Sequence, residues 1–174
     1  SRGCTALDTV VEGLSTRLVA VRRHLHQHPE PSREEQVTSQ FLAEQLQQAG
    51  AVTRLGRDGT GVIADLDLGV PASDAPRIAL RADIDALRIQ DAKSTPYASQ
   101  RAGLCHACGH DAHATMVLGA ALATAQMNAT PVSPPVPGIR LRLIFQPAEE
   151  LGEGGRAMVE QGAVDDCAAI LGLH

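Results

Sequence analysis

The sequence predicts an α/β domain in which a layered mixed sheet is flanked by helices. Segments with helical periodicity alternate with short runs that are rich in aliphatic and β-branched residues. The 174 residues suit a single domain, and a composition of 44% hydrophobic and 20% charged residues is ordinary for a globular protein with a real core.

Two helices are expected first. Apolar residues three or four positions apart predict a helix over residues 5–28, which Pro29 ends. Ser32 and Glu35 have the spacing of a capping box, so we expect them to start a second helix that ends at Gly50.

Three β-rich runs bounded by Gly, Pro and Asp predict strands at residues 51–55, 61–68 and 77–84. Residues 85–103 have no clear period and contain Pro96, so we expect an irregular connection that leads to Cys105.

The second half repeats the alternation of helix and strand. A helix is expected over residues 111–128, followed by a stiff proline-rich linker at 130–138. Residues 139–145 alternate as in a strand, a Gly-rich turn then precedes a short helix at 156–161, and a last strand is expected at 168–173.

Ligand-capable residues crowd into the nine positions from Cys105 to His113. A single cysteine is usually a small buried hydrophobe. A thiolate and an imidazole two residues apart, as at Cys108 and His110, are costly to bury together without a partner, and a cation is the simplest one.

Two adjacent acids, Glu149 and Glu150, directly follow a predicted strand. Taken alone, they could equally be an exposed charged turn. Neighbouring side chains on a non-helical segment point in different directions, so one carboxylate could bind a metal while the other takes a proton from water. Ligands in α/β proteins gather at the carboxyl ends of strands, which fits this position.

Charge and composition disfavour several classes of partner. A net charge of −5 and only three aromatic residues argue against nucleic-acid binding. The longest mostly apolar run, 114–125, is shorter than the ~20 residues that span a bilayer, so no membrane helix is expected. We recognise no secretory signal, and the four irregularly spaced cysteines fit a reducing, cytoplasmic setting better than a disulfide framework.

Five segments together resemble the motifs of the M20 metallopeptidase family, in its amidohydrolase branch of hippurate hydrolases, N-acyl-amino-acid deacylases and plant auxin-conjugate hydrolases. They are RRHLHQHPE (22–30), RADIDAL (81–87), HACGHDAH (106–113), QPAEE (146–150) and GLH (172–174). The resemblance covers nearly the whole chain and implies a zinc-exopeptidase-like catalytic domain.

The resemblance also implies a site that holds two divalent metal ions, Mn²⁺ or Zn²⁺. Its ligands would be Cys108, His110, Glu150 and His174. Glu149 would act as general base on a water activated by both metals, and would split the amide bond of small N-acyl amino acids such as hippurate. Three further residues would orient the ligands, namely Asp83, Asp111 and His113.

Two departures from the family pattern stand out. Arg88 occupies a position where the family usually has Pro. Family members are also longer, with a lid and dimerisation domain and one more metal-binding His after the equivalent of His174. We therefore expect residues 1–174 to be the N-terminal part of the catalytic domain without that lid, with little turnover alone, and a homodimer if the full-length protein carries the lid.

Two alternatives stay open. Cys105 and Cys108 form a C-x-x-C, which could belong to a redox module, although thioredoxin-like proteins place that motif after their first strand. The chain could also be a truncated, catalytically incompetent metal-binding fragment of an amidohydrolase.

Overall fold

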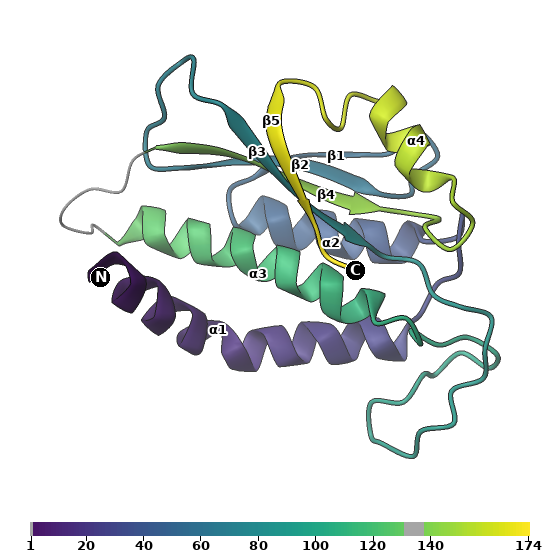
Figure 1. Ribbon diagram of the computed structural model, residues 1–174. Helices are drawn as coiled ribbons and strands as arrows, with labels where there is room; N and C mark the ends of the chain where they lie inside the picture. The colour runs from purple at the N-terminus through teal and green to yellow at the C-terminus, as the bar shows by residue number, and fades with distance from the viewer. Residues whose placement is uncertain (1, 131–137) are drawn as a thin grey trace.

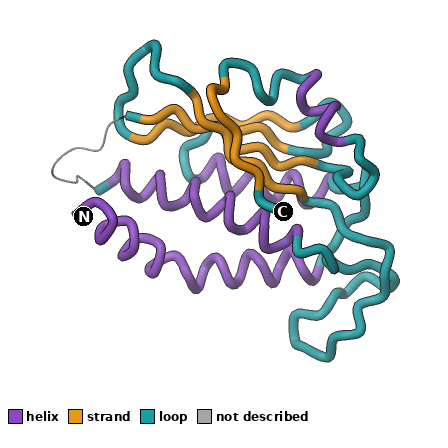
Figure 2. The backbone as a smooth tube through the Cα atoms, viewed as in Figure 1, coloured by secondary structure: helices purple, strands orange, loops and turns teal. Residues whose placement is uncertain are grey.

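The computed structural model describes residues 2–130 and 138–174, without the side chains of residues 2–5. A five-stranded sheet has three helices on one face and a short helix on the other (Figure 1; Figure 2). The elements are α1 (Arg2–Gln27), α2 (Gln36–Gln48), β1 (Val52–Leu55), β2 (Val62–Leu68), β3 (Arg77–Asp83), α3 (His110–Ala129), β4 (Ile139–Gln146), α4 (Gly154–Glu160) and β5 (Cys167–Gly172). The predicted α/β class with a mixed, helix-flanked sheet is confirmed.

The strand order in the sheet is β1-β2-β4-β3-β5. The pairs β1–β2 and β2–β4 are antiparallel, whereas β3 runs parallel to both β4 and β5. The carboxyl ends of β3, β4 and β5 therefore lie together on one side of the sheet, beside the first turn of α3 and the C-terminus of the chain (Figure 1). An α/β sheet usually holds its ligand at the carboxyl ends of its strands.

Apolar side chains on both faces of the sheet form the core. The larger cluster lies between the sheet and α1, α2 and α3, and it includes the fully buried Phe145, Leu143 and Leu118. A smaller cluster places Met158 of α4 against Ile144 on the opposite face. The consecutive apolar residues at 143–145 are thus explained, because this part of β4 is covered on both sides.

The predicted capping box is wrong. The Ser32 hydroxyl donates to Asp85 at 2.7 Å, and the Glu35 carboxylate accepts the N–H of Ala148 at 2.8 Å, so neither side chain caps α2. Glu30 takes that role instead, since its carboxylate accepts the backbone N–H groups of residues 37 and 38 in the first turn.

The other elements follow the sequence predictions to within two residues, except that α1 begins three residues earlier. The connection at 85–103 contains no helix or strand, and its regular contacts are isolated bridges such as that between Leu87 and Cys105. The proline-rich linker lies mostly outside the described residues. Within the described ranges, no helix combines the length and apolar character needed to cross a bilayer.

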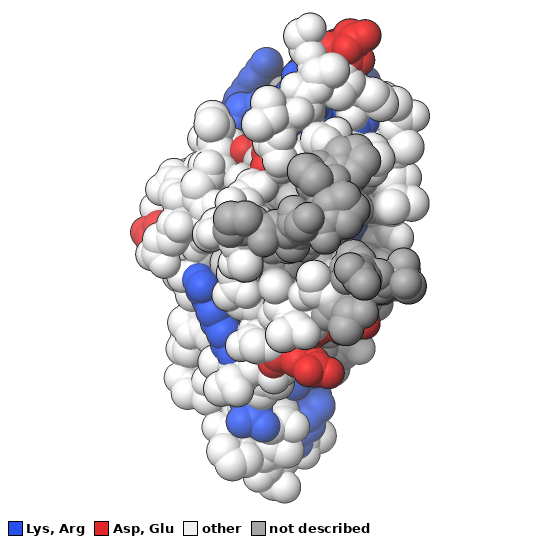
Figure 3. All heavy atoms as spheres, turned by 90° about the vertical axis from the view of Figure 1, so that its left-hand side faces the viewer, with Lys and Arg blue, Asp and Glu red and all other residues white. Residues whose placement is uncertain are grey.

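Charged residues are dispersed on the face drawn in Figure 3. Lys and Arg side chains alternate there with Asp and Glu side chains, and they form no continuous basic patch on that face. A charged pair also joins two strands of the sheet. Arg142 on β4 binds Asp65 on β2 through two nitrogens, at 2.8 and 2.9 Å.

This pair predicts a pH-dependent stability. Burial alone would raise the pKa of Asp65, but the hydrogen bonds and charge of Arg142 hold that pKa below its ordinary value of 3.8. A lowered carboxyl pKa contributes stability above the ordinary value, and the contribution is lost as the pH falls through the lower folded-state pKa. We expect Asp65→Asn to reduce the free energy of unfolding by about 1 kcal/mol at pH 7 and by much less at pH 3. The effect at pH 7 is this small because the Asp65 side chain is partly exposed to solvent.

Urea unfolding of both proteins at the two pH values measures this difference. Asp67→Asn on the same strand is the control, because the Asp67 side chain is exposed. An equal loss of stability for Asp65→Asn at pH 7 and pH 3 would contradict the prediction.

Candidate metal centre

Acidic and imidazole side chains converge where the three parallel strands end. Asp83 is the last residue of β3, Glu149 follows β4, His174 follows β5, and His110 opens α3. Each residue offers one ligand atom, and these four atoms all lie within 4.8 Å of one another. Segments far apart in the sequence thus meet in a space the size of a metal centre.

The remaining predicted residues lie at the same place. Ligand atoms of Cys108, His110 and His174 also lie within 4.8 Å of one another. Glu150 Oε1 is 3.8 Å from His110 Nε2. The structure therefore brings together all four predicted ligands and Glu149, although the ligand role of each stays a prediction.

His110 is held with one nitrogen facing this cluster. Its side chain is fully buried, and Nδ1 lies 2.8 Å from the backbone carbonyl of Asp85, to which it donates. Nε2 then carries a lone pair. Around it lie carboxylate oxygens at 3.6, 3.7 and 3.8 Å, from Asp83, Glu149 and Glu150 respectively.

These groups fit a cation. Among the described residues, His110 Nε2 and Glu150 Oε1 are buried atoms without a hydrogen-bond partner. A lone pair surrounded by carboxylate oxygens is unfavourable in a buried site unless a positive charge lies between them. Imidazole, carboxylate and thiolate ligands together suit a divalent transition metal.

Protonation can supply part of that charge when no metal is bound. Burial would lower the pKa of His110, but its hydrogen bond with Asp85 and the charge of Asp83 raise the pKa above the ordinary value. The pKa of the Cys108 thiol is raised as well, chiefly by a hydrogen bond with Glu150. A bound metal would replace these protons, as is general for thiol and imidazole ligands.

The loop that carries the two glutamates is fixed by buried acids. Ala148 has φ 48°, an uncommon conformation for a residue with a Cβ, and its N–H donates to Glu35. Burial raises the pKa of Glu35. The next anchor is Asp85, whose Oδ2 accepts the N–H of Glu150 at 3.0 Å. The direction of Glu149 and Glu150 therefore depends on side chains from distant segments.

Asp85 is the positioning residue that sequence reasoning missed. Its carboxylate contacts Ser32, the Glu150 N–H and, at 3.2 Å, His110 Nδ1. Burial would raise the pKa of Asp85, but these hydrogen bonds lower it to about 2. Asp83 ends β3 and Asp85 follows two residues later, and this position was a usable signal because ligands gather at the carboxyl ends of strands.

The three residues expected to orient ligands differ from one another. Asp83 accepts a hydrogen bond from His113 Nδ1 at 2.9 Å and also lies among the possible ligands itself. Asp111 lies elsewhere, because its carboxylate binds His26 at 2.6 Å and Arg22 at 2.9 Å. The structure thus places Asp83 and His113 at the site and assigns Asp111 to another group of side chains.

Two other features noted in the sequence lie away from the centre. Arg88 forms an exposed ion pair with Glu34 at 2.5 Å. In the C-x-x-C segment, Cys105 is buried, Cys108 is exposed, and both are free thiols. They belong to different clusters of possible ligands, which disfavours a redox pair.

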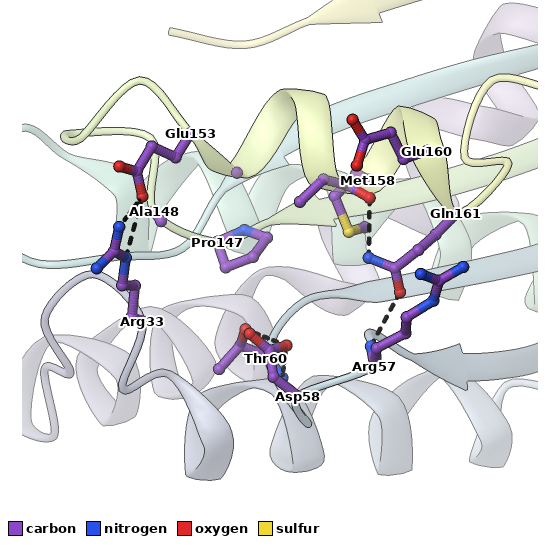
Figure 4. Close-up of a pocket in the computed structure, with 12 residues that line it drawn as sticks. Arg33, Arg57, Asp58, Thr60, Pro147, Ala148, Glu153, Met158, Glu160 and Gln161 are labelled. Atoms are coloured by element: carbon purple, nitrogen blue, oxygen red, sulfur yellow. Dashed lines mark hydrogen bonds and ion pairs between the residues drawn. The ribbon is translucent and has the colours of Figure 1, made fainter.

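A separate pocket of about 330 Å³ lies beside α4 (Figure 4). An ion pair between Arg33 and Glu153 and a hydrogen bond from the Arg57 N–H to Gln161 border it. None of the four predicted ligands lines this pocket.

Known proteins are similar to this chain over most of its length. N-acetyl-L-cysteine deacetylase of Bacillus subtilis is 44% identical over 92% of the chain, which spans 36% of that protein. N-acyl-L-amino acid amidohydrolase of Geobacillus stearothermophilus is 39% identical over 97% of the chain, which spans 43% of it. The chain thus spans less than half the length of these relatives.

A solved structure agrees with these sequence matches. The YXEP protein of Bacillus subtilis, a dinuclear metal binding peptidase, aligns with 94% of this chain at a TM-score of 0.82 and 39% identity, over 43% of its own length. The family model for peptidase family M20/M25/M40 matches residues 79–174, the half that carries β3, α3, β4 and β5. The chain belongs to the M20 peptidase family.

Proposed function

We propose that the protein is a metal-dependent amidohydrolase that cleaves the amide bond of N-acyl amino acids, hippurate-like substrates among them. Residues 1–174 would be the N-terminal part of its catalytic domain. The observation that carries this proposal is the meeting of one thiol, two imidazoles and the two glutamates of residues 149–150 at the ends of the parallel strands. The relatives named as deacetylase and amidohydrolase support the reaction class.

The proposed ligands of two divalent ions are Cys108, His110, Glu150 and His174. The dinuclear metal binding peptidase of the same fold supports the number of ions. When bound, the ions supply a lower pKa for the attacking water and polarise the amide carbonyl. The thiolate favours Zn²⁺ and the carboxylates also suit Mn²⁺, so we propose one of these two.

Glu149 is the proposed general base. Its carboxylate lies 3.4 Å from His174 Nε2 and 3.7 Å from His110 Nε2, so the neighbouring imidazoles hold it at the centre of the cluster. Its side chain is 26% exposed and can be reached by a substrate. Glu149 takes a proton from the attacking water and then passes it to the amine nitrogen that leaves.

The cellular setting and assembly are proposals of the same kind. The described cysteines are all free thiols, which supports a reducing cytoplasm. A homodimer is proposed for a full-length protein that carries a lid domain. A metal-binding fragment without catalytic function is the less favoured alternative, because the relatives are named as hydrolases.

Replacing each of the adjacent glutamates separates their two roles. In the full-length protein, we expect Glu149→Gln to lower kcat by at least about 100-fold, because the general base is lost, while Mn²⁺ binding stays within about twofold. Glu150→Gln should weaken Mn²⁺ binding by at least about tenfold, because a ligand loses its charge. Hydrolysis of N-acetyl and N-benzoyl amino acids and equilibrium dialysis against Mn²⁺ measure the two effects.

Glu153→Gln, three residues further along on an exposed side chain, is the matched control and should change neither quantity. Full turnover in Glu149→Gln would exclude it as the base. Unchanged Mn²⁺ binding in Glu150→Gln would exclude it as a ligand.

Asp85→Asn tests the anchor of the site. The carboxylate orients both His110 and the Glu150 backbone, so its neutralisation should weaken Mn²⁺ binding by about 10-fold or more. Isothermal titration measures the affinity, and Asp67→Asn on the exposed side of β2 is the control. Equal Mn²⁺ affinities in the wild type and Asp85→Asn would show that Asp85 does not position the ligands.

A further inference from the structure

A second cluster of ligand-capable side chains lies apart from the proposed centre. His26 comes from the end of α1, Asp91 from the connection at 85–103, and Cys105 from the bridge to residue 87. One ligand atom of each lies within 4.8 Å of the others. The side chains of His26 and Asp91 are 1% and 2% exposed, and Cys105 is 3% exposed.

The imidazole of His26 is oriented toward this cluster by Asp111. Nδ1 lies 2.6 Å from Asp111 Oδ2, which is also paired with Arg22 at 2.9 Å. A carboxylate oxygen accepts, so Nδ1 donates to Asp111 and Nε2 is left facing Asp91 and Cys105. A carboxylate that holds the far nitrogen of an imidazole is the usual partner of a metal-binding histidine.

His26 Nε2 faces the carboxylate of Asp91. It is buried without a hydrogen-bond partner in the described part of the chain, and Asp91 Oδ2 lies 3.5 Å away. Hydrogen bonds from the N–H groups of Ser99 and Lys93 hold the pKa of Asp91 below its ordinary value, so the side chain is an anion. A buried imidazole nitrogen that faces a buried carboxylate without a hydrogen bond marks a place that a cation can fill.

Lys93, the only lysine of the chain, supplies a cation on one side. Its ammonium lies 3.2 Å from Asp91 Oδ1 and 3.7 Å from Cys105 Sγ. The side chain is 44% exposed and can swing into solvent. The ammonium faces Oδ1, whereas His26 Nε2 faces Oδ2 at 3.5 Å.

We propose that His26, Asp91 and Cys105 form an additional metal site, which binds one Zn²⁺-class divalent ion in competition with the Lys93 ammonium. Imidazole, carboxylate and thiolate are three ligands that suit tetrahedral Zn²⁺, with the fourth position left to water. Binding replaces the proton of the Cys105 thiol and releases Lys93 toward solvent. The ion would join the end of α1, the 85–103 connection and the segment before α3.

The two cysteines allow this site to be tested separately from the proposed centre. Co²⁺ replaces Zn²⁺ and reports a thiolate ligand by charge-transfer absorption in the near ultraviolet. In the Cys108→Ser protein, we expect Co²⁺ to retain such a band from Cys105. Adding Cys105→Ser should abolish the band, whereas adding Cys167→Ser as the matched control should leave it unchanged.

Two further substitutions test whether the Lys93 ammonium competes with the metal ion, and they remain informative if Cys105→Ser does not fold. In the Cys108→Ser background, Lys93→Met should tighten Co²⁺ binding several-fold, because the internal cation is gone. Asp91→Asn should weaken it by about tenfold or more. Absence of the band in Cys108→Ser, or equal Co²⁺ affinities in these variants, would overturn the proposal, and neither result would bear on hydrolysis at Glu149.

Discussion

Three carboxylates are held together at the carboxyl ends of β3, β4 and β5, where Arg81 pairs with Asp83 at 3.0 Å, and this constraint governs the surrounding structure. Asp83, Glu149 and Glu150 place oxygens within 4 Å of a single buried nitrogen of His110. Such a group of acids is stable in a folded protein only with a compensating cation or proton. The segments around the site therefore have to hold like charges together against their repulsion.

The anchors that do this are buried acids rather than bases. Glu35 and Asp85 accept the N–H groups of Ala148 and Glu150, and so they fix the backbone instead of neutralising its side chains. Each anchor reaches across more than sixty positions of sequence. Parallel pairing of β3 with β4 and β5 supplies the coarse placement, and these hydrogen bonds supply the fine orientation that a hydrolytic site needs.

Features that depend on the local sequence could be predicted, whereas features that depend on contacts between distant residues could not. The strand at β4 and the helix at α3 were predictable because each is a local run of apolar and small residues, of the length usual for its type, that is largely buried. The start of α2 was not, since Ser32 and Glu35 have the right spacing for a capping box but hydrogen-bond with Asp85 and Ala148. The grouping of the site residues was foreseen from the motifs, whereas the role of Asp85 depends on contacts that spacing does not reveal.

The first turn of α3 lies between the proposed metal centre at the strand ends and the proposed second metal site at His26, Asp91 and Cys105. In both, an imidazole faces carboxylate oxygens. His110 faces the acids at the strand ends, while the next residue, Asp111, faces away and orients His26 toward Asp91 and Cys105. Successive helical residues point about 100° apart, so one turn can serve both sides. The two sites differ in how their charge is balanced. The second has an internal ammonium at its rim. At the first, Arg81 pairs with Asp83 at 3.0 Å, whereas Glu149 and Glu150 lie beside the imidazole of His110.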